Sequence, residues 1–254
     1  MPTNFDDLLE GDEGADLLQG LSGNDTLQGF SGNDLLYGGA DNDSLLGDDG
    51  VDQLYGGSGL DTLFAGAGDD RVEGGSGDDQ LYGEGGNDSL TGGDGNDTLI
   101  GDIGNDTIRG GFGDDLISDD IGGGFASIFG DSGNDRIILT SISLGMIDGG
   151  ADDDFIDASR NTYARETQIF GGDGNDVVRT GSASVDCGTG DDAVIFAAML
   201  PQHEAGWTGS YEGGDGYDRF LYSVNYDNYD QRSDIYLDWT RVTGFEEIVL
   251  RILE

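Results

Sequence analysis

The sequence contains no lysine, one cysteine, one histidine and two prolines. Because Cys187 is the single cysteine, a disulfide bond within the chain is excluded. Since His203 is the single histidine, a zinc site of three or four cysteine and histidine ligands is excluded as well. Serine or cysteine nucleophile chemistry would have to rely on this same histidine. No apolar run approaches the ~18 residues of a membrane-spanning helix. The common hydrolase and zinc-enzyme classes are therefore not expected in this chain.

Positive charge is almost as scarce, with ten arginines against 53 acidic residues and a formal net charge of −43. This balance excludes a nucleic-acid binder that neutralises phosphates, and it disfavours docking on an anionic membrane. Of the acids, 43 are aspartate, and 49 residues are glycine. Because both residue types are poor helix formers, a helical domain is excluded. Such acidity is typical of disordered chains and of chains that bind cations.

Aspartate recurs at unbroken steps of nine residues through the first half of the chain. An aliphatic residue follows two positions after each of these aspartates, and glycine precedes most of them by two and by five positions. The series comprises Asp7, Asp16, Asp25, Asp34, Asp43, Asp52, Asp61, Asp70, Asp79, Asp88, Asp97, Asp106 and Asp115. A repeat of this length indicates a solenoid.

Each nonapeptide combines a glycine-rich turn with a short strand. The glycines permit the positive φ angles of a tight turn, and the aliphatic between outward neighbours has the period of a strand. Two nonapeptides therefore form one coil of eighteen residues, with turns alternating between the two edges of a flattened solenoid. Since the acids repel one another and each repeat buries only one aliphatic, the coil requires a bound cation. Carboxylate and carbonyl oxygens without a soft ligand favour calcium, in several copies.

Two segments, Gly74–Leu81 and Gly92–Leu99, match the pattern Gly-Gly-x-Gly-x-Asp-x-aliphatic in full. The chain thus resembles the RTX (repeats-in-toxin) calcium-binding family with hemolysin-type nonapeptide repeats. The resemblance implies an all-β fold, a right-handed parallel β-roll or β-solenoid, with calcium between stacked turns and each aspartate bridging ions. It also implies type I secretion and a location outside the cell or on its surface. Asp41 and Ala65 depart from the pattern at glycine positions, so weaker or distorted sites are expected there.

The turn motif returns five times in the second half, ending at Asp135, Asp154, Asp176, Asp192 and Asp218. Their spacings lie near a full coil, which predicts one calcium turn per coil, on the edge that contains Asp25 and Asp115. The opposite edge, with Asp16 and Asp106, is expected to end near Asp120 and to carry insertions at 161–166 and 199–208. We therefore divide the chain into a regular roll, 1–124, and an irregular solenoid, 125–254. The apolar stretch 235–254 is interpreted as a cap that seals the core, or as a secretion signal.

One file of outward residues in the regular part is apolar: Leu46, Phe64, Tyr82 and Ile100, at eighteen-residue spacing. A file of mostly threonine and serine lies beside it. This ladder is interpreted as a docking face for an adjoining domain, a glycan or a second copy. The alternative interpretation is that strands simply favour such residues.

The sequence favours a secreted, non-enzymatic calcium-binding module that folds on extracellular calcium. Alternatives are a module, catalytic or not, of a secreted polysaccharide-acting enzyme of the epimerase type, and a component of a surface layer or adhesin. Only carboxylates, tyrosines and arginines remain for catalysis, most plausibly within 125–254. Ice binding is not predicted, because the third turn position shows no row of threonines but Glu13, Ser22, Ser31, Ala40 and Asp49 in succession.

Overall fold

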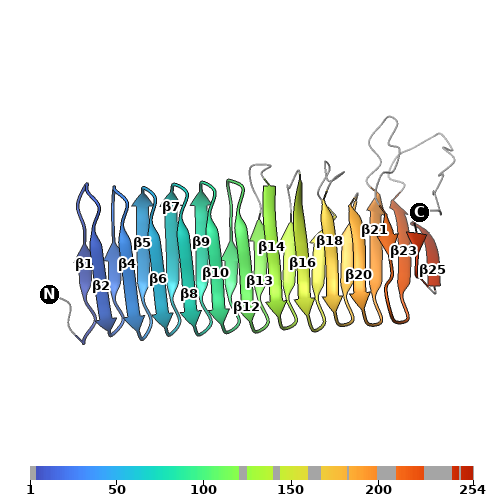
Figure 1. Ribbon diagram of the computed structural model, residues 1–254, viewed down its shortest axis with the longest axis horizontal. Helices are drawn as coiled ribbons and strands as arrows, with labels where there is room; N and C mark the ends of the chain where they lie inside the picture. Colours follow the sequence, from blue (N-terminus) through green and yellow to red (C-terminus); the bar gives the residue numbers. More distant parts are fainter. Residues whose placement is uncertain are drawn as a thin grey trace.

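The computed structural model is a long solenoid made of two parallel β-sheets, with successive strands alternating between them (Figure 1). It describes residues 4–119, 125–139, 144–159, 167–181, 183–198, 210–225, 242–245 and 247–253. Within these ranges there is no helix, and hence none of the length and apolar character that crossing a membrane requires. The all-β parallel solenoid expected from the repeat is confirmed.

One sheet, here called the odd sheet, has 13 strands. These are β1 Leu8–Glu10, β3 Thr26–Gln28, β5 Ser44–Asp49, β7 Thr62–Ala67, β9 Gln80–Gly85, β11 Thr98–Ile100, β13 Leu116–Asp119, β15 Arg136–Leu139, β17 Phe155–Ala158, β19 Val177–Thr180, β21 Ala193–Ala198, β23 Arg219–Asn225 and β25 Glu247–Leu253.

The other sheet, the even sheet, has 12 strands. These are β2 Leu17–Ser22, β4 Leu35–Ala40, β6 Gln53–Ser58, β8 Arg71–Ser76, β10 Ser89–Asp94, β12 Thr107–Phe112, β14 Phe125–Ser132, β16 Leu144–Ala151, β18 Gln168–Asp173, β20 Ser184–Thr189, β22 Tyr211–Glu212 and β24 Val242–Thr243.

In the regular part each residue pairs with the residue eighteen positions later. Leu45 lies beside Leu63 in the odd sheet, and Leu36 beside Leu54 in the even sheet. All four side chains are fully buried, because the aliphatic of each repeat points between the two sheets. Each contributes roughly 2 kcal/mol of hydrophobic stabilisation. The core is therefore a double file of aliphatic side chains along the solenoid axis.

The turns need left-handed backbone at their second and fourth positions. Gly57 and Gly59 have φ angles of +114° and +138°, and a Cβ on Gly59 would collide with the carbonyl oxygen of Asp41 on the preceding coil. Asp41 itself fills a fourth position with a φ of +76°, a conformation that aspartate tolerates. The turn therefore keeps its path despite this departure from the repeat. Leu21 fills a second turn position with a φ of +86°. Unlike aspartate, leucine has no short polar side chain that favours this conformation, so the backbone is strained there.

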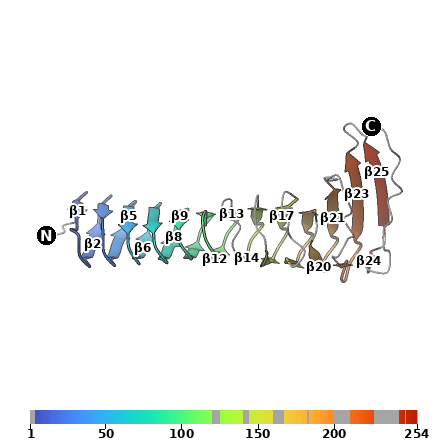
Figure 2. The same ribbon diagram turned by 90° about the horizontal axis from the view of Figure 1, so that it is seen from above.

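Aromatic side chains replace the aliphatic files at the C-terminal end. The ring of Tyr211 lies 5.2 Å from that of Phe220, which in turn lies 5.5 Å from that of Phe245, measured between centroids. Phe196 meets Tyr211 edge-on at 6.2 Å. Strands β23 and β25 extend beyond the width of the stack (Figure 2). Residues 235–241 of the predicted cap, and the insertions predicted at 161–166 and 199–208, lie outside the described residues.

Candidate metal sites

The repeat aspartates form two ladders along the edges of the solenoid. In each rung the backbone N–H of one aspartate donates a hydrogen bond to Oδ1 of the aspartate one coil further on, as from Asp79 to Asp97 at 2.7 Å. The long ladder, at the turns that lead from even to odd strands, holds Asp7, Asp25, Asp43, Asp61, Asp79, Asp97, Asp115, Asp135, Asp154, Asp176, Asp192 and Asp218. The short ladder, at the opposite edge, holds Asp16, Asp34, Asp52, Asp70, Asp88 and Asp106.

The second-half aspartates lie on the edge that their spacing predicts. The N–H of Asp115 donates to Asp135 at 2.8 Å, so the long ladder continues without a break past residue 124. The short ladder stops at Asp106. Ala126 takes the next place in its column, because Ser127 pairs with Thr107, and Gly145 follows in register with Ala126. Asp120, near which the sequence placed the end, lies outside the described residues.

The second carboxylate oxygen of most of these aspartates is buried and accepts no hydrogen bond from the described residues, whereas Oδ2 of Asp16 accepts the N–H of Asp12 at 2.7 Å. Asp79 and Asp88, for example, are 1% and 2% exposed, and their Oδ2 atoms have no partner among the described residues. The same holds for Oδ2 of Asp25, Asp34, Asp43, Asp52, Asp61, Asp70, Asp97, Asp106, Asp115, Asp135, Asp154, Asp176 and Asp192. Leaving a charged acceptor buried without a partner costs several kcal/mol per group as an order of magnitude. A cation that met these oxygens would remove this cost.

Glycine at the first turn position leaves room beside each Oδ2. A Cβ on Gly74 would lie 2.5 Å from Oδ2 of Asp79 and 2.7 Å from the carbonyl oxygen of Gly92 on the next coil. Carboxylate and backbone carbonyl oxygens converge on one cradle in most such turns, although no carbonyl oxygen is among the atoms nearest the Cβ position of Gly101. The space in the cradle therefore favours glycine at the first position, where the backbone angles do not require it.

Burial raises the pKa of several ladder carboxyl groups in the metal-free protein, on both edges of the solenoid. For Asp79 and Asp115 the pKa rises from 3.8 to about 7, and for Asp154 to about 8. Desolvation is the largest cause, the backbone N–H donor opposes it, and the neighbouring aspartates raise the pKa further. The ladders therefore need either protons or a bound cation.

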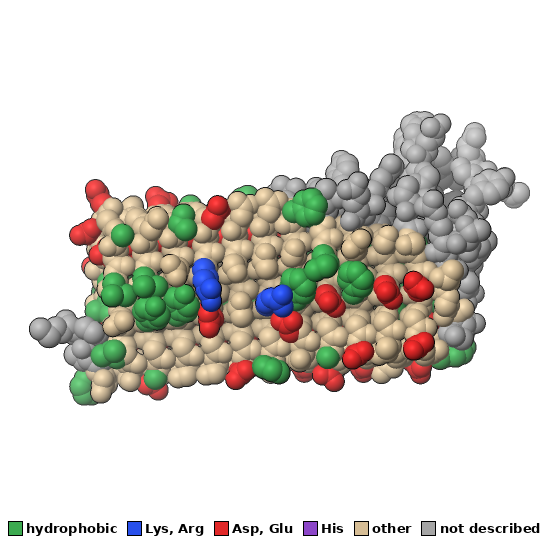
Figure 3. Space-filling model, in the orientation of Figure 1, with side chains coloured by type: hydrophobic (Ala, Val, Ile, Leu, Met, Phe, Trp, Pro, Cys, Tyr) green, Lys and Arg blue, Asp and Glu red, His purple; other side chains and the backbone are tan. Residues whose placement is uncertain are grey.

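The arginines of the described residues form their ion pairs away from the ladders. The ion pairs of the described residues join Arg71 to Glu73 at 3.0 Å and Arg109 to Asp131 at 3.1 Å, both on the outward side. Arg179 and Arg219 likewise pair with Asp157 and Glu247. On the face shown in Figure 3 basic side chains are few among acidic and hydrophobic ones. None of these four ion pairs involves a ladder aspartate.

The donor set fits calcium. Apart from the turn that begins at Cys187, the donors in the cradles are hard oxygens, which suit calcium and not zinc or copper. Within the described ranges no three histidine, cysteine or acidic side chains converge on one point. A calcium ion between two coils would therefore be held by aspartates of the ladder and, for the rest, by backbone carbonyls of the turns.

A family model of four RTX calcium-binding nonapeptide repeats matches most of the chain. The matches cover 3–29, 10–45, 28–63, 46–81, 55–90, 82–117, 146–161 and 168–184, together more than half of the sequence. The chain belongs to the RTX calcium-binding repeat family. Calcium binding and the RTX solenoid expected from the sequence are thereby confirmed.

Among solved structures, this RTX chain is similar to a hyperactive, Ca²⁺-dependent, β-helical antifreeze protein from an Antarctic bacterium. The sequences are 24% identical, the match covers 96% of this chain and 92% of the other, and the TM-score is 0.52. At this identity the likeness shows the shared fold. No curated protein matches the sequence.

A second column of hydrogen bonds, not anticipated from the sequence, lies just outside each aspartate ladder. Here the N–H of one coil donates to the side-chain oxygen of the residue preceding the ladder aspartate one coil earlier, as from Asn96 to Asp78 at 2.8 Å and from Asp114 to Asn96 at 2.8 Å. The sequence feature from which this column could have been predicted is the Asn or Asp that precedes the ladder aspartate in the Gly-Asn-Asp and Gly-Asp-Asp strings of the RTX repeat. This outer column needs no metal, because its donors and acceptors satisfy one another.

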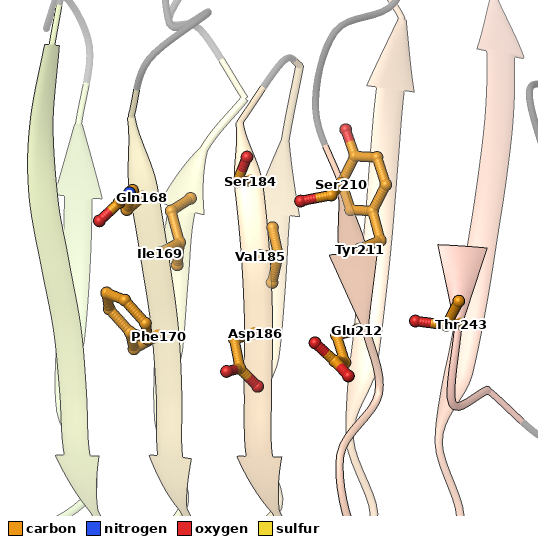
Figure 4. Close-up of a pocket in the computed structure, with 10 residues that line it drawn as sticks. All are labelled: Gln168, Ile169, Phe170, Ser184, Val185, Asp186, Ser210, Tyr211, Glu212 and Thr243. Carbon is orange, nitrogen blue, oxygen red and sulfur yellow. The ribbon is translucent and has the colours of Figure 1, made fainter. Parts of the chain in front are cut away.

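A shallow hollow lies over β18, β20, β22 and β24 of the RTX solenoid (Figure 4). Asp186 and Glu212 stand side by side on adjacent strands, with Phe170 next to them in the row. Both carboxylates are exposed, so they lack the desolvation that tunes a catalytic acid. The hollow therefore contains two neighbouring carboxylates, as the site of a polysaccharide-acting enzyme does, but both are exposed to solvent.

Proposed function

We propose that this chain is an extracellular module that folds cooperatively when calcium fills its two aspartate ladders, and that it serves as a structural or interaction part of a secreted protein. The observation that carries the proposal is the file of buried Oδ2 atoms without a hydrogen-bond partner. Family membership supports the choice of calcium.

We further propose that the ladder aspartates are the calcium ligands, because each contributes an Oδ2 atom to the cradle of its turn. Without calcium their mutual repulsion keeps the chain unfolded. Each ion would lie between two coils, so binding and folding become one event, and neighbouring coils couple to give a sharp transition. The affinity expected of such extracellular sites is on the order of 10⁻⁴–10⁻³ M, which leaves the chain unfolded in the cytosol and ready for type I secretion.

Far-ultraviolet circular dichroism during a calcium titration from EDTA, with magnesium as control, tests this proposal. The expected result is a disordered spectrum that changes cooperatively to a β spectrum with calcium and not with magnesium. A β spectrum that persists in EDTA at about pH 8 would contradict it. The polysaccharide-acting alternative would then be tested first, by calcium-dependent activity on a panel of polyuronates.

The apolar ladder Leu46, Phe64, Tyr82 and Ile100 is half-buried and continuous on the odd sheet. The rings of Phe64 and Tyr82 stack at 4.7 Å with their planes 10° apart. Their faces therefore meet each other and their edges face outward, which adds cohesion between coils of about 1 kcal/mol. A docking role for this ladder remains a prediction.

The docking role is tested by the double variant Phe64→Ser, Tyr82→Ser. Calcium-dependent folding is expected to persist while association with the partner, or with a second copy, is lost. The matched control is Tyr37→Ser, Tyr55→Ser, which removes the other stacked pair, at 5.0 Å, from the even sheet. If the Phe64, Tyr82 variant sediments like this control, the docking role is contradicted, and the ladder only stabilises the contact between neighbouring coils.

An antifreeze role, which the solved neighbour has, is not part of the proposal. The third turn position lacks the regular threonine row that a flat ice-binding array requires, with Ser22, Ala40 and Ser58 in successive turns of one edge.

A further inference from the structure

Cys187 occupies a place that glycine holds in the other turns of the long ladder. It begins the turn 187–192 at the end of β20, is fully buried, and forms no disulfide bond. At Gly171 and Gly213, the same position on the adjacent coils, a Cβ would lie 2.5 and 2.7 Å from Oδ2 of the aspartate five residues later. The side chain of Cys187 is therefore directed into the cradle of Asp192.

Asp192 presents an unused acceptor to this cradle. The carboxylate is 1% exposed, its Oδ1 accepts the N–H of Asp176 at 2.8 Å, and its Oδ2 has no hydrogen-bond partner among the described residues. Burial raises the pKa of the Cys187 thiol, and the charges of Asp192, Asp218, Asp176 and Asp186 raise it further. One cradle of the long ladder thus combines a sulfur donor with a carboxylate oxygen.

The comparison with Ala65 shows what the sulfur adds. Ala65 fills the equivalent glycine position on the short ladder, and the rung from Asp52 to Asp70 is intact there at 2.7 Å. A Cβ is therefore tolerated in the cradle, and alanine already fills it with a methyl group. Cysteine differs from alanine in this place by its soft ligand atom alone.

We infer that the cradle of Cys187 and Asp192 is a site for one thiophilic divalent cation, such as Cd²⁺ or Zn²⁺, within a file of calcium sites. This inference rests on the proposed function, because the surrounding rungs must first be folded by calcium. The ligands are Sγ of Cys187, Oδ2 of Asp192 and backbone carbonyls. Thiolate selects such metals over calcium. On binding, the sulfur–metal bond forms and the thiol proton leaves to solvent, so that no oxidant or reductant is needed.

The test is a titration of the calcium-saturated full chain with CdCl₂, followed by the thiolate-to-cadmium charge-transfer absorbance in the ultraviolet. We expect one cadmium per chain, retained in excess calcium. Cys187→Ala, which reproduces the Ala65 arrangement, should abolish the band. Asp192→Asn should weaken cadmium binding at least ~10-fold, while Asp78→Asn, at an exposed position outside the ladders, should leave it unchanged.

Cadmium NMR provides a second measurement should Asp192→Asn fail to fold, because the chemical shift distinguishes a mixed sulfur–oxygen site from an all-oxygen one. Absence of the band in the wild-type chain, or equal cadmium affinity with and without Asp192, would overturn the inference and leave Cys187 as a small buried residue. Circular dichroism of the same samples separates the two proposals. A chain that fails to fold with calcium contradicts the proposed function, and a folded chain without the band contradicts the cadmium site alone.

Discussion

Adjacent aspartates in one turn have opposite environments. Asp79 is 1% exposed and places Oδ2 in a cradle, whereas Asp78 is exposed and accepts the N–H of Asn96 at 2.8 Å. Successive residues of extended backbone point to opposite sides, so a step of one residue separates a candidate ligand from a surface acceptor. The sequence string Asp-Asp does not by itself reveal which member is buried. The nine-residue register does.

This difference predicts the outcome of a matched pair of substitutions. Asp79→Asn is expected to raise the calcium midpoint severalfold and to lower the stability of the calcium-bound form by about 2 kcal/mol, because a buried charged oxygen is lost. Asp78→Asn should leave the midpoint unchanged, since asparagine already fills this position on the next coil at Asn96. Calcium titrations monitored by circular dichroism measure both. Equal midpoints for the two variants would argue against Asp79 as a ligand.

At the scale of the strand stack, the outer column avoids like charges on adjacent coils. Along the long-ladder edge it reads, in order, Asp78, Asn96, Asp114, Asn134, Asp153, Asn175 and Asp191. Asn134 and Asn175 also donate through Nδ2 to the preceding aspartate, at 3.0 and 2.9 Å. Coils lie about 4.8 Å apart, a distance at which charges of one sign repel appreciably. Alternation doubles that separation.

Asn134→Asp should therefore destabilise the calcium-bound solenoid. The change puts three carboxylates on consecutive coils and removes an amide donor, and we expect Tm to fall by about 2–4 °C. Asn134→Ala is the control, because it loses the donor without adding charge. Added salt should recover part of the loss for Asn134→Asp only, since screening acts on the repulsion. A loss independent of salt would show that the alternation is not electrostatic.

At the scale of the whole molecule, protons and calcium compensate the same buried charge. The pKa values of Asp79, Asp88 and Asp115 rise to about 7 and that of Asp154 to about 8, from 3.8, through burial and the neighbouring carboxylates. Because the folded state binds the proton more tightly than the unfolded chain, these groups stabilise the metal-free fold below about pH 4. That stability is lost as the pH rises through about 7.

In EDTA, a β spectrum is thus expected near pH 4 and a disordered one near pH 8. In calcium the dependence reverses, and the midpoint concentration should rise as the pH falls below about 7, because protons compete for the same oxygens. Circular dichroism between pH 4 and pH 8 measures both pH dependences, the one in EDTA and the one in calcium. A metal-free chain that is equally disordered at acid and alkaline pH would show that proton binding does not replace the cation.

Much of the fold could be predicted from the sequence because residues that are one coil apart in the sequence are also neighbours in space. Residues eighteen apart in the regular part are neighbours in space, so the spacing of Asp43 and Asp61 states directly which residues pair. The same logic placed Asp135 beside Asp115 although the interval there is twenty residues. The departure at Asp41 kept the turn intact because aspartate accepts the positive φ that the turn needs.

Composition and spacing alone determined the all-β class, the coil, the inward aliphatics and the edge on which each aspartate lies, since all of these follow from period and alternation. Only the stacked structure decided that Oδ1 joins the coils while Oδ2 stays without a hydrogen bond, as at Asp79. It also decided that Phe64 and Tyr82 turn their faces to each other, and that Cys187 is fully buried at a position where the adjacent coils have glycine. The physical reason is that a repeat specifies which residues become neighbours, whereas close packing of neighbouring coils decides which atoms meet and which are left for a cation.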